Sequence, residues 1–487
     1  MANVERDHAA RIEAIERRLA PLVAPGEAVL DSARTPLVDR MAEAGTPGVG
    51  IAVIDDGRIA WERGYGVLEA GQPAPVTPAT LFQCASISKP IAAVTALRLV
   101  EAGALTLDGD VNDLLTSWRI PPVIGWGERG RVEAQPRITL RQLLSHTAGL
   151  TVHGFPGYAV GATLPSLLDI LDGAPTANTP PIRVDTLPGA QMRYSGGGYV
   201  VLAQLLEDVT GTPFAALARE LTLEPLGMLS SNFEQPLTPA RAPLAARAHR
   251  AQAEPVPGGW HVYPELAPDG LWAPPGDLAR FALGLQAALR EEPGAILSPA
   301  KMREMMTPQA PEADVESVGL GIFLDGAGEK ARFGHTGGNA GFGCELTAYQ
   351  WRGQGAVVMT NSDTGWLIYK ALLNTMAEVY AWPDYTPFAL SGDWRFWAGP
   401  VKTLLALLCG VYVDDNGRRC VISQKDSELW LALGDQPPLL LSAESATDWE
   451  IEGAHARVSF TLGDDGAATS LTLRQNQRAL TMRRSEA

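Results

Sequence analysis

Segments with strand character lie at both ends of a long stretch of this chain, and helical segments lie between them. At the first end, an apolar run over 49–54, the turn pair Asp56-Gly57 and a returning segment over 58–61 predict a β-hairpin. At the far end, three more segments read as strands, over 320–324, 344–349 and 356–361. We therefore expect one α/β domain whose mixed, mainly antiparallel sheet combines both ends and is flanked by helices.

Apolar residues at helical spacing predict the elements between these strands. The segment 86–100 has such residues at Ile91, Val94 and Leu97, and Gly103 suits the stop of that helix. Four other helices are expected, over 9–22, from 139 onward, over 198–210 and over 366–380. The central helices are expected to form a helical subdomain, with loops around a small helix over 151–190.

The pattern changes after Tyr380, where a segment rich in proline and aromatic residues begins. Short strand-like runs then recur every eight to twelve residues, a spacing typical of a small antiparallel barrel or sandwich. These runs cover 420–423, 429–433, 439–442, 458–462, 470–473 and 479–483. The expected organisation is an N-terminal helix and lead-in (1–34), an α/β domain (35–382), a linker (383–400) and a β-barrel domain (401–487).

Charge and hydropathy exclude several classes of protein. The 487 residues include 55 Asp and Glu against 39 Lys and Arg, a formal net charge of −16, so no positive field attracts nucleic acid or anionic lipid. The longest strongly apolar stretch, 404–413, is half of the ~20 residues that a membrane-spanning helix needs. We expect neither a nucleic-acid partner nor a membrane.

The expected location of the chain is cytoplasmic. Charges recur through the segment 1–21, where a signal peptide needs an uninterrupted apolar region. The four cysteines are too scattered for a disulfide framework or a zinc site, so they read as reduced thiols.

The first candidate for chemistry is the pair Ser86 and Lys89 in the segment SISK. Residues three apart share one face of a helix, so the amine can reach the hydroxyl. The same spacing occurs at Ser298 and Lys301, where Pro299 favours a helix cap instead. Ser86 differs because it begins a strongly apolar helix, whose free amides and dipole favour a developing alkoxide. A capping serine with a solvated lysine is the alternative.

Two glycine-rich segments are the next candidates. Tyr194-Ser195-Gly196-Gly197-Gly198-Tyr199 opens a helix, and its glycines allow a close approach of the backbone to a ligand. His335-Thr336-Gly337-Gly338 lies between strand-like segments, and glycines on an edge strand indicate that something lies against the backbone. The structural alternatives are a tight turn and a hairpin bend.

In this order, the three segments resemble the S-x-x-K, Y-x-N and K-T-G or H-T-G elements of the serine β-lactamase and penicillin-binding-protein superfamily. The segments 144–150 (LSHTAGL) and 270–278 (GLWAPPGDL) also look like landmarks of that family. The pattern is most similar to the class C-like branch of carboxylesterases and D-aminopeptidases. The strand-rich tail is similar to the lipocalin-like C-terminal barrels of some of these hydrolases.

The resemblance implies a role for each matched residue. Ser86 would attack an ester or amide carbonyl and form an acyl-enzyme that water releases. Lys89 and Tyr194 would share the proton transfers, and which of them is the base stays open. The backbone amides of Ser86 and Gly338 would form the oxyanion hole. His335 stands where many relatives have lysine, and no metal or organic cofactor is required.

The substrate pocket is expected to include seven positions. They are His335, Thr336, Gly337, Gly196, Tyr263, Trp272 and Phe342, of which the three aromatic residues could equally belong to the core. Gly196 departs from the family pattern, because penicillin-recognising members keep an asparagine there that binds the substrate amide. The absence of this asparagine disfavours efficient β-lactamase activity.

The expected function is therefore that of an SxxK serine hydrolase that cleaves carboxylic esters. A D-amino-acid peptidase or amidase is the second interpretation, and a weak β-lactamase is the third. A catalytically silent protein that binds an acyl or peptidyl ligand is the alternative from another class. The expected partner is a small ester or a short peptide, and a homo-oligomer is possible.

Overall fold

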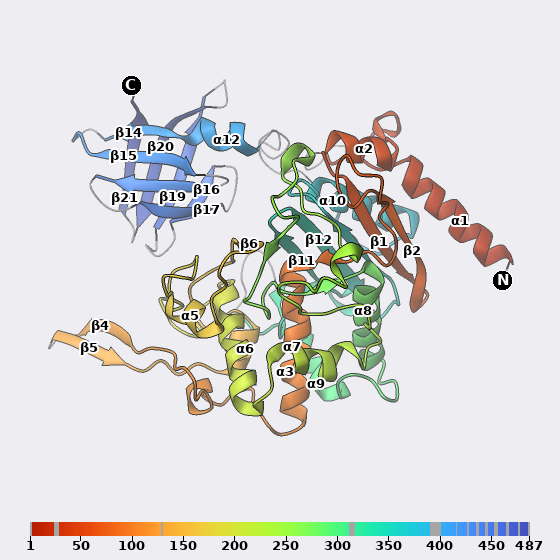
Figure 1. Ribbon diagram of the computed structural model, residues 1–487, viewed down its shortest axis with the longest axis horizontal. Coiled ribbons are helices and arrows are strands. Elements are labelled where there is room, and N and C mark those ends of the chain that lie inside the picture. The colour runs from red at the N-terminus through yellow and green to blue at the C-terminus, as the bar shows by residue number, and fades with distance from the viewer. Residues whose placement is uncertain are drawn as a thin grey trace. The chain divides into compact units, whose positions relative to one another are not determined.

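The chain divides into two compact units in a computed structural model (Figure 1). The first unit comprises 1–21 and 29–388, and the second comprises 22–28 and 389–487. The structure describes residues 2–23, 29–127, 130–310, 317–389 and 401–485 without 415, 426–427, 435–437, 444–446, 452–455, 464–466 and 476–477. The expected linker over 383–400 lies outside the described residues from 390 onward, and its part up to 388 belongs to the first unit.

The first unit is built around a seven-stranded antiparallel sheet in the order β2-β1-β13-β12-β11-β10-β9. In that order the strands span Arg58–Gly66, Gly48–Asp55, Gly355–Thr360, Phe342–Tyr349, Arg332–Asn339, Phe323–Asp325 and Ser317–Val318. Strand β1 pairs with β13, with Val49 opposite Thr360, so the sheet combines both ends of the domain as the sequence predicts.

Helices cover both faces of this sheet. Helix α8 (Pro275–Leu289) packs on one face of β1 and β13, where Pro275 lies against Gly50. Helix α10 (Trp366–Val379) packs on the opposite face, where Tyr369 lies against Gly343. The N-terminal helix α1 (Ala2–Arg17) packs on α10. The sheet is therefore covered on both sides. Its strands β1 and β13 are buried almost throughout, whereas the edge strand β2 is mostly half-buried or exposed.

A helical region lies between β2 and β9 in the chain. Besides α8, its longest members are α3 (Ser88–Glu101) and α6 (Gly196–Thr210), and their apolar side chains join one continuous core with the sheet. The other helices of the unit are α2 (Leu37–Glu43), α4 (Leu140–Leu144), α5 (Leu167–Asp172), α7 (Phe214–Ala218) and α9 (Pro299–Met305). The helix expected from position 139 is confirmed, with Thr139 as its cap in a capping box.

Short elements complete the first unit. Paired strands are β3 (Phe82–Gln83) with β8 (Trp272–Ala273), β4 (Val123–Gly127) with β5 (Gly130–Ala134), and β6 (Tyr158–Ala159) with β7 (His261–Val262). Single helical turns are η1 (Asp31–Ala33), η2 (Ala85–Ile87), η3 (Val111–Asp113), η4 (Arg219–Leu223), η5 (Ala242–Leu244), η6 (Ala251–Ala253) and η7 (Gly328–Lys330).

The second unit is a closed antiparallel barrel of eight strands, preceded by helix α12 (Val401–Leu408). The strands β14 to β21 span Gly410–Val413, Arg419–Lys425, Glu428–Leu433, Leu439–Ala443, Asp448–Ile451, Ala456–Leu462, Ala468–Gln475 and Arg478–Arg484. Alternate side chains such as Cys420 and Ile422 point into the barrel core. The six strands expected from the sequence are confirmed, and β14 and β18 complete the ring.

Long apolar helices are few in the described part of the chain. No single helix there is long and apolar enough to cross a membrane, and the one pair that reaches the length together, 196–210 with 214–223, is bent by 85° at its break.

Candidate active site

Ser86 lies in a strained turn that precedes helix α3. The turn is η2, and the backbone φ of its first residue, Ala85, is +46°, in a region that residues with a Cβ rarely occupy. Ala85 and Ile87 are fully buried on either side, whereas Ser86 is partly exposed. The strain is thus held in place by core packing and presents the Ser86 hydroxyl at the end of a helix.

The Lys89 ammonium group is buried directly beneath Ser86. Its Nζ donates to Ser86 Oγ at 2.9 Å and to the carbonyl oxygen of Pro268 at 3.1 Å. The side chain is 1% exposed, and Nζ lies 4.9 Å from the centre of the Tyr194 ring. Because Lys89 is screened from water, its interactions with these neighbours are stronger than those of a surface lysine.

A third charged group, Asp269, completes this arrangement and was missed by the sequence reasoning. Ser86 Oγ donates to Asp269 Oδ1 at 3.0 Å, and Lys89 Nζ lies 3.6 Å from the same oxygen. Asp269 directly precedes Gly270-Leu271-Trp272, part of a landmark segment, and this adjacency is the one signal that could have indicated it.

Tyr194 lies immediately before the capping residue of α6, Ser195. Its ring stacks on His146 with 4.3 Å between ring centres, and His146 Nδ1 accepts from the Ser195 backbone at 3.1 Å. Burial raises the pKa of Tyr194, the nearby Lys89 charge lowers it, and Asp269 raises it again, with a net upward shift. Tyr194 is therefore a neutral phenol near pH 7.

Strand β11 lies directly against the nucleophile turn. It pairs with β10 only over 332–334, so its later residues face η2. A Cβ at Gly337 would collide with the carbonyl oxygen of Cys84 and would lie 2.7 Å from Cys344 Sγ. Glycine is thus required at this position, because only a bare backbone allows the strand to approach this closely.

His335 is a neutral side chain in this strand. Its Nδ1 lies 2.6 Å from the carbonyl oxygen of Thr336, an acceptor, so Nδ1 carries the proton and Nε2 is left as an acceptor. Burial, aided by the Lys89 charge, lowers the pKa of His335 to about 3. A position that holds a cationic lysine in many relatives is therefore uncharged here.

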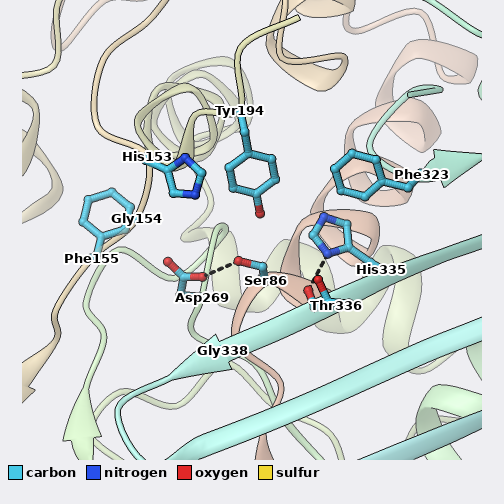
Figure 2. A pocket seen from close by; sticks show the side chains of 10 residues that line it. All are labelled: Ser86, His153, Gly154, Phe155, Tyr194, Asp269, Phe323, His335, Thr336 and Gly338. Carbon is cyan, nitrogen blue, oxygen red and sulfur yellow. Dashed lines mark hydrogen bonds between the residues drawn. The ribbon is translucent and has the colours of Figure 1, made fainter. Parts of the chain in front are cut away.

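These groups line a cavity of about 330 Å³, shown in Figure 2. The Tyr194 hydroxyl and the Asp269 carboxylate both point toward Ser86. The lining residues are Ser86, His153, Gly154, Phe155, Tyr194, Asp269, Phe323, His335, Thr336 and Gly338. His153, Phe155 and Phe323 were not expected, because their segments carry no motif. In the described part of the chain, no group of three His, Cys, Asp or Glu side chains could hold a metal ion.

Three aromatic residues expected in the pocket lie in the core instead. Tyr263 and Trp272 are fully buried and Phe342 is 2% exposed. Trp272 packs edge-on against Phe342, and the Tyr263 hydroxyl accepts from the Ala340 backbone at 2.9 Å. Their apolar surface is used for packing between the sheet and the 263–272 loop. Phe155 and Phe323 line the cavity together with Tyr194.

Gly196 was also expected to line the substrate pocket, but it is not among the residues that line the cavity. Its backbone N–H donates to the carbonyl oxygen of His153 at 3.0 Å, and a Cβ at this position would lie 2.8 Å from the Phe155 ring. Phe155 therefore occupies the space next to position 196, and a larger residue there would displace it. Gly196 holds the loop that brings His153 and Phe155 to the cavity.

The second serine–lysine pair confirms that spacing alone does not define a site. Ser298 caps helix α9, where its Oγ accepts from the Lys301 backbone at 3.3 Å and Pro299 is the first helical residue. The Lys301 ammonium bonds Glu304 at 2.6 Å. This is the capping arrangement that the sequence predicts for it.

Comparison with known proteins agrees with this geometry. The Beta-lactamase family matches residues 34–369, and the chain belongs to this family. Esterase EstB of Burkholderia gladioli is 31% identical over 246 residues, which are 49% of this chain and 57% of the esterase. That match spans just over half of the esterase.

Two further comparisons cover most of the chain. Penicillin-binding protein 4* of Bacillus subtilis (strain 168) is 23% identical over 438 residues, 86% of this chain and 90% of that protein. The structure of an octameric penicillin-binding protein homologue from Pyrococcus abyssi matches with a TM-score of 0.57 and 21% identity, over 91% of this chain and 98% of that one. The resemblance drawn from the three motifs is confirmed, and the chain belongs to the serine β-lactamase and penicillin-binding-protein superfamily.

Replacing Gly337 by alanine should separate strand β11 from the nucleophile turn. We expect a loss of about 1–3 kcal/mol in the free energy of unfolding, since the collision is with backbone, and at least a tenfold loss of hydrolysis. Gly338→Ala is the stability control, because a Cβ there meets nothing within 4 Å. Equal unfolding midpoints in urea for the two variants would contradict the proposed close approach.

Acidification should destabilise the fold through its buried imidazoles. Burial lowers the pKa of His335 to about 3 and also lowers that of His146. Below the ordinary pKa of about 6.5 the unfolded chain takes up protons that the folded chain refuses, so stability falls as the pH falls from there toward 3. Relative to His335→Asn, the wild type should lose up to about 1.4 kcal/mol per pH unit in this window. A pH-independent difference in urea unfolding would contradict this.

Proposed function

We propose that this protein hydrolyses carboxylic esters through an acyl-enzyme formed on Ser86. The observation that carries the proposal is the buried contact of 2.9 Å from Lys89 Nζ to Ser86 Oγ. Ser86 lies at the wall of a cavity that Tyr194 also lines. A hydroxyl held this way by a buried cation is suited to become an alkoxide, because the positive charge stabilises the developing negative charge.

The reaction would proceed in two stages at this hydroxyl. Ser86 Oγ attacks the ester carbonyl as its proton passes to a neighbouring base, and the carbonyl electrons move onto oxygen. The backbone amides of Ser86 and Gly338, which both line the cavity, would hold that oxyanion, a contribution of about 3 kcal/mol per donor. The alcohol leaves, and water then attacks the acyl group by the reverse sequence.

The charge of the cavity favours esters over penicillins. Penicillins carry a carboxylate, yet the described residues that line the cavity include the acidic Asp269 and neither lysine nor arginine. The neutral His335 offers no positive charge, and Gly196 offers no side-chain donor for a substrate amide. The relative from Burkholderia gladioli is named an esterase, which supports the same choice.

An amidase or peptidase acting on D-amino-acid derivatives is the second candidate. An amide needs its leaving amine protonated, and the raised pKa of Tyr194 keeps a phenolic proton available beside Ser86. Rates on matched ester and anilide substrates with one acyl group would decide between the two functions.

The test of the proposed function is hydrolysis of p-nitrophenyl acetate. Ser86→Ala should lower kcat by about 10⁴-fold or more, and mass spectrometry of the wild type with a fluorophosphonate should place one adduct on Ser86. Ser298→Ala is the matched control from the second serine–lysine pair, expected to lose about 1 kcal/mol of stability as a helix cap with its activity unchanged. Equal rates for wild type and Ser86→Ala would refute the proposal and favour a binding protein.

Self-association and cytoplasmic location stay predictions. The homologue from Pyrococcus abyssi is described as octameric, which supports a homo-oligomer for this chain as well. Size-exclusion chromatography with light scattering should give a mass above that of one chain, and a monomer at micromolar concentration would contradict the prediction.

A further inference from the structure

The direction of the Ser86 hydroxyl indicates where its proton goes. Ser86 Oγ carries one hydrogen, and it donates that hydrogen to Asp269 Oδ1 at 3.0 Å. In the contact with Lys89, by contrast, Ser86 Oγ is the acceptor, and Lys89 Nζ donates to it at 2.9 Å. An ammonium has no lone pair, so Lys89 in this arrangement stabilises the oxygen and takes no proton from it.

Burial fixes the charges of Lys89 and Asp269 together. Their charged atoms lie 3.6 Å apart, and the side chains are 1% and 5% exposed. If Lys89 were neutral, the Asp269 carboxylate would be a buried charge without compensation, which is costly. The pair therefore holds Lys89 as the ammonium and Asp269 as the carboxylate.

The backbone holds Asp269 firmly in this position. Its N–H donates to the carbonyl oxygen of Leu266 at 3.1 Å, and its own carbonyl oxygen accepts from Asn339 Nδ2 at 3.2 Å. Asn339 belongs to β11, the strand that lies against the nucleophile turn. The carboxylate is thus positioned by the same strand that positions Gly338 at the cavity.

We propose that Asp269 is the general base that takes the proton of Ser86 during acylation. The inference rests on the proposed function, because it concerns the acylation step of that reaction. The Oγ–carbonyl carbon bond forms, the carbonyl π electrons move onto oxygen, and the Oγ proton passes to Asp269 Oδ1. Collapse breaks the bond to the alkoxide leaving group, which takes the proton held by Asp269, either directly or through Tyr194, whose phenol then gives one proton and receives the one from Asp269.

Several titratable groups lie around Asp269. Lys89 contributes the nearest opposite charge. Tyr194, Tyr263 and Glu265 lie close enough for the Asp269 charge to raise the pKa of each, in addition to the larger effect of burial. His335 and His153 face the same cavity, and His335 is neutral at the pH of interest because burial lowers its pKa to about 3.

The first experiment is the pH dependence of fluorophosphonate labelling of the wild type. With a carboxylate base, labelling should reach its plateau by neutral pH, because carboxylic acids ordinarily lose their proton well below it. With an amine or a phenol as the base, the rate should instead keep rising about tenfold per pH unit into the alkaline range, because such groups still carry their proton at neutral pH. That alkaline rise would overturn the proposal, and it needs no variant to be detected.

The second experiment removes the base but keeps the shape of the side chain. Asp269→Asn should lower kcat/KM for p-nitrophenyl acetate by about 10²–10⁴-fold, and Asp269→Ala should regain activity with added formate. Asp277→Asn is the matched control. This equally buried carboxylate accepts from Ser231 Oγ at 2.9 Å, outside the cavity lining, so its loss should lower stability and leave the pH profile unchanged.

The outcomes separate this inference from the proposed function. If Ser86 of the wild type is labelled and Asp269→Asn is labelled at the same rate, the general-base role fails and the acyl-enzyme mechanism stands. If Ser86 of the wild type is not labelled and no ester is hydrolysed, the proposed function fails. Loss of labelling in Asp269→Asn with a native unfolding transition, together with rescue of Asp269→Ala by formate, supports the role of Asp269.

Discussion

Lys89 is a cation in the interior of the protein, and the surroundings of Ser86 are organised to accommodate it. Its ammonium donates to Ser86 Oγ and to Pro268, lies near the Asp269 carboxylate and approaches the face of the Tyr194 ring. Each of these groups stabilises a charge that burial alone would disfavour. Ser86, Asp269 and Tyr194 lie close together because each of them stabilises the buried charge of Lys89.

That charge also sets the electrostatics of its neighbours. Together with burial it lowers the pKa values of His335 and His146, so both imidazoles are neutral. Burial raises the pKa of Tyr194 more strongly than Lys89 lowers it. The surroundings of Ser86 thus combine a phenol, a carboxylate and neutral imidazoles, and the proposed preference for esters over penicillins rests partly on this combination.

The framework around the site depends on close backbone contacts. Strand β11 approaches the nucleophile turn because position 337 has no Cβ, and the loop with Phe155 closes on Gly196 for the same reason. In both places glycine lets two backbones meet, and neither glycine is among the residues that line the cavity. These two glycines, expected at the substrate pocket, allow the close approaches around the cavity.

The sequence by itself determined the elements that depend on neighbours along the chain. Helical spacing predicted α3 and placed Ser86 near Lys89, and the turn pair Asp56-Gly57 predicted the first hairpin. Strand alternation predicted most of the barrel. These patterns are readable because each follows from a local period of side chains.

Only the tertiary structure decided which distant residues complete the site. Asp269 meets Ser86 from 183 positions away along the chain, and Phe155 and Phe323 take the places expected for Tyr263, Trp272 and Phe342. No local period encodes such contacts, because they depend on how the 263–272 loop, the sheet and the helical region pack together. The two serine–lysine pairs illustrate the limit: their spacing is the same, and burial of one lysine beside a carboxylate distinguishes a candidate active site from a helix cap.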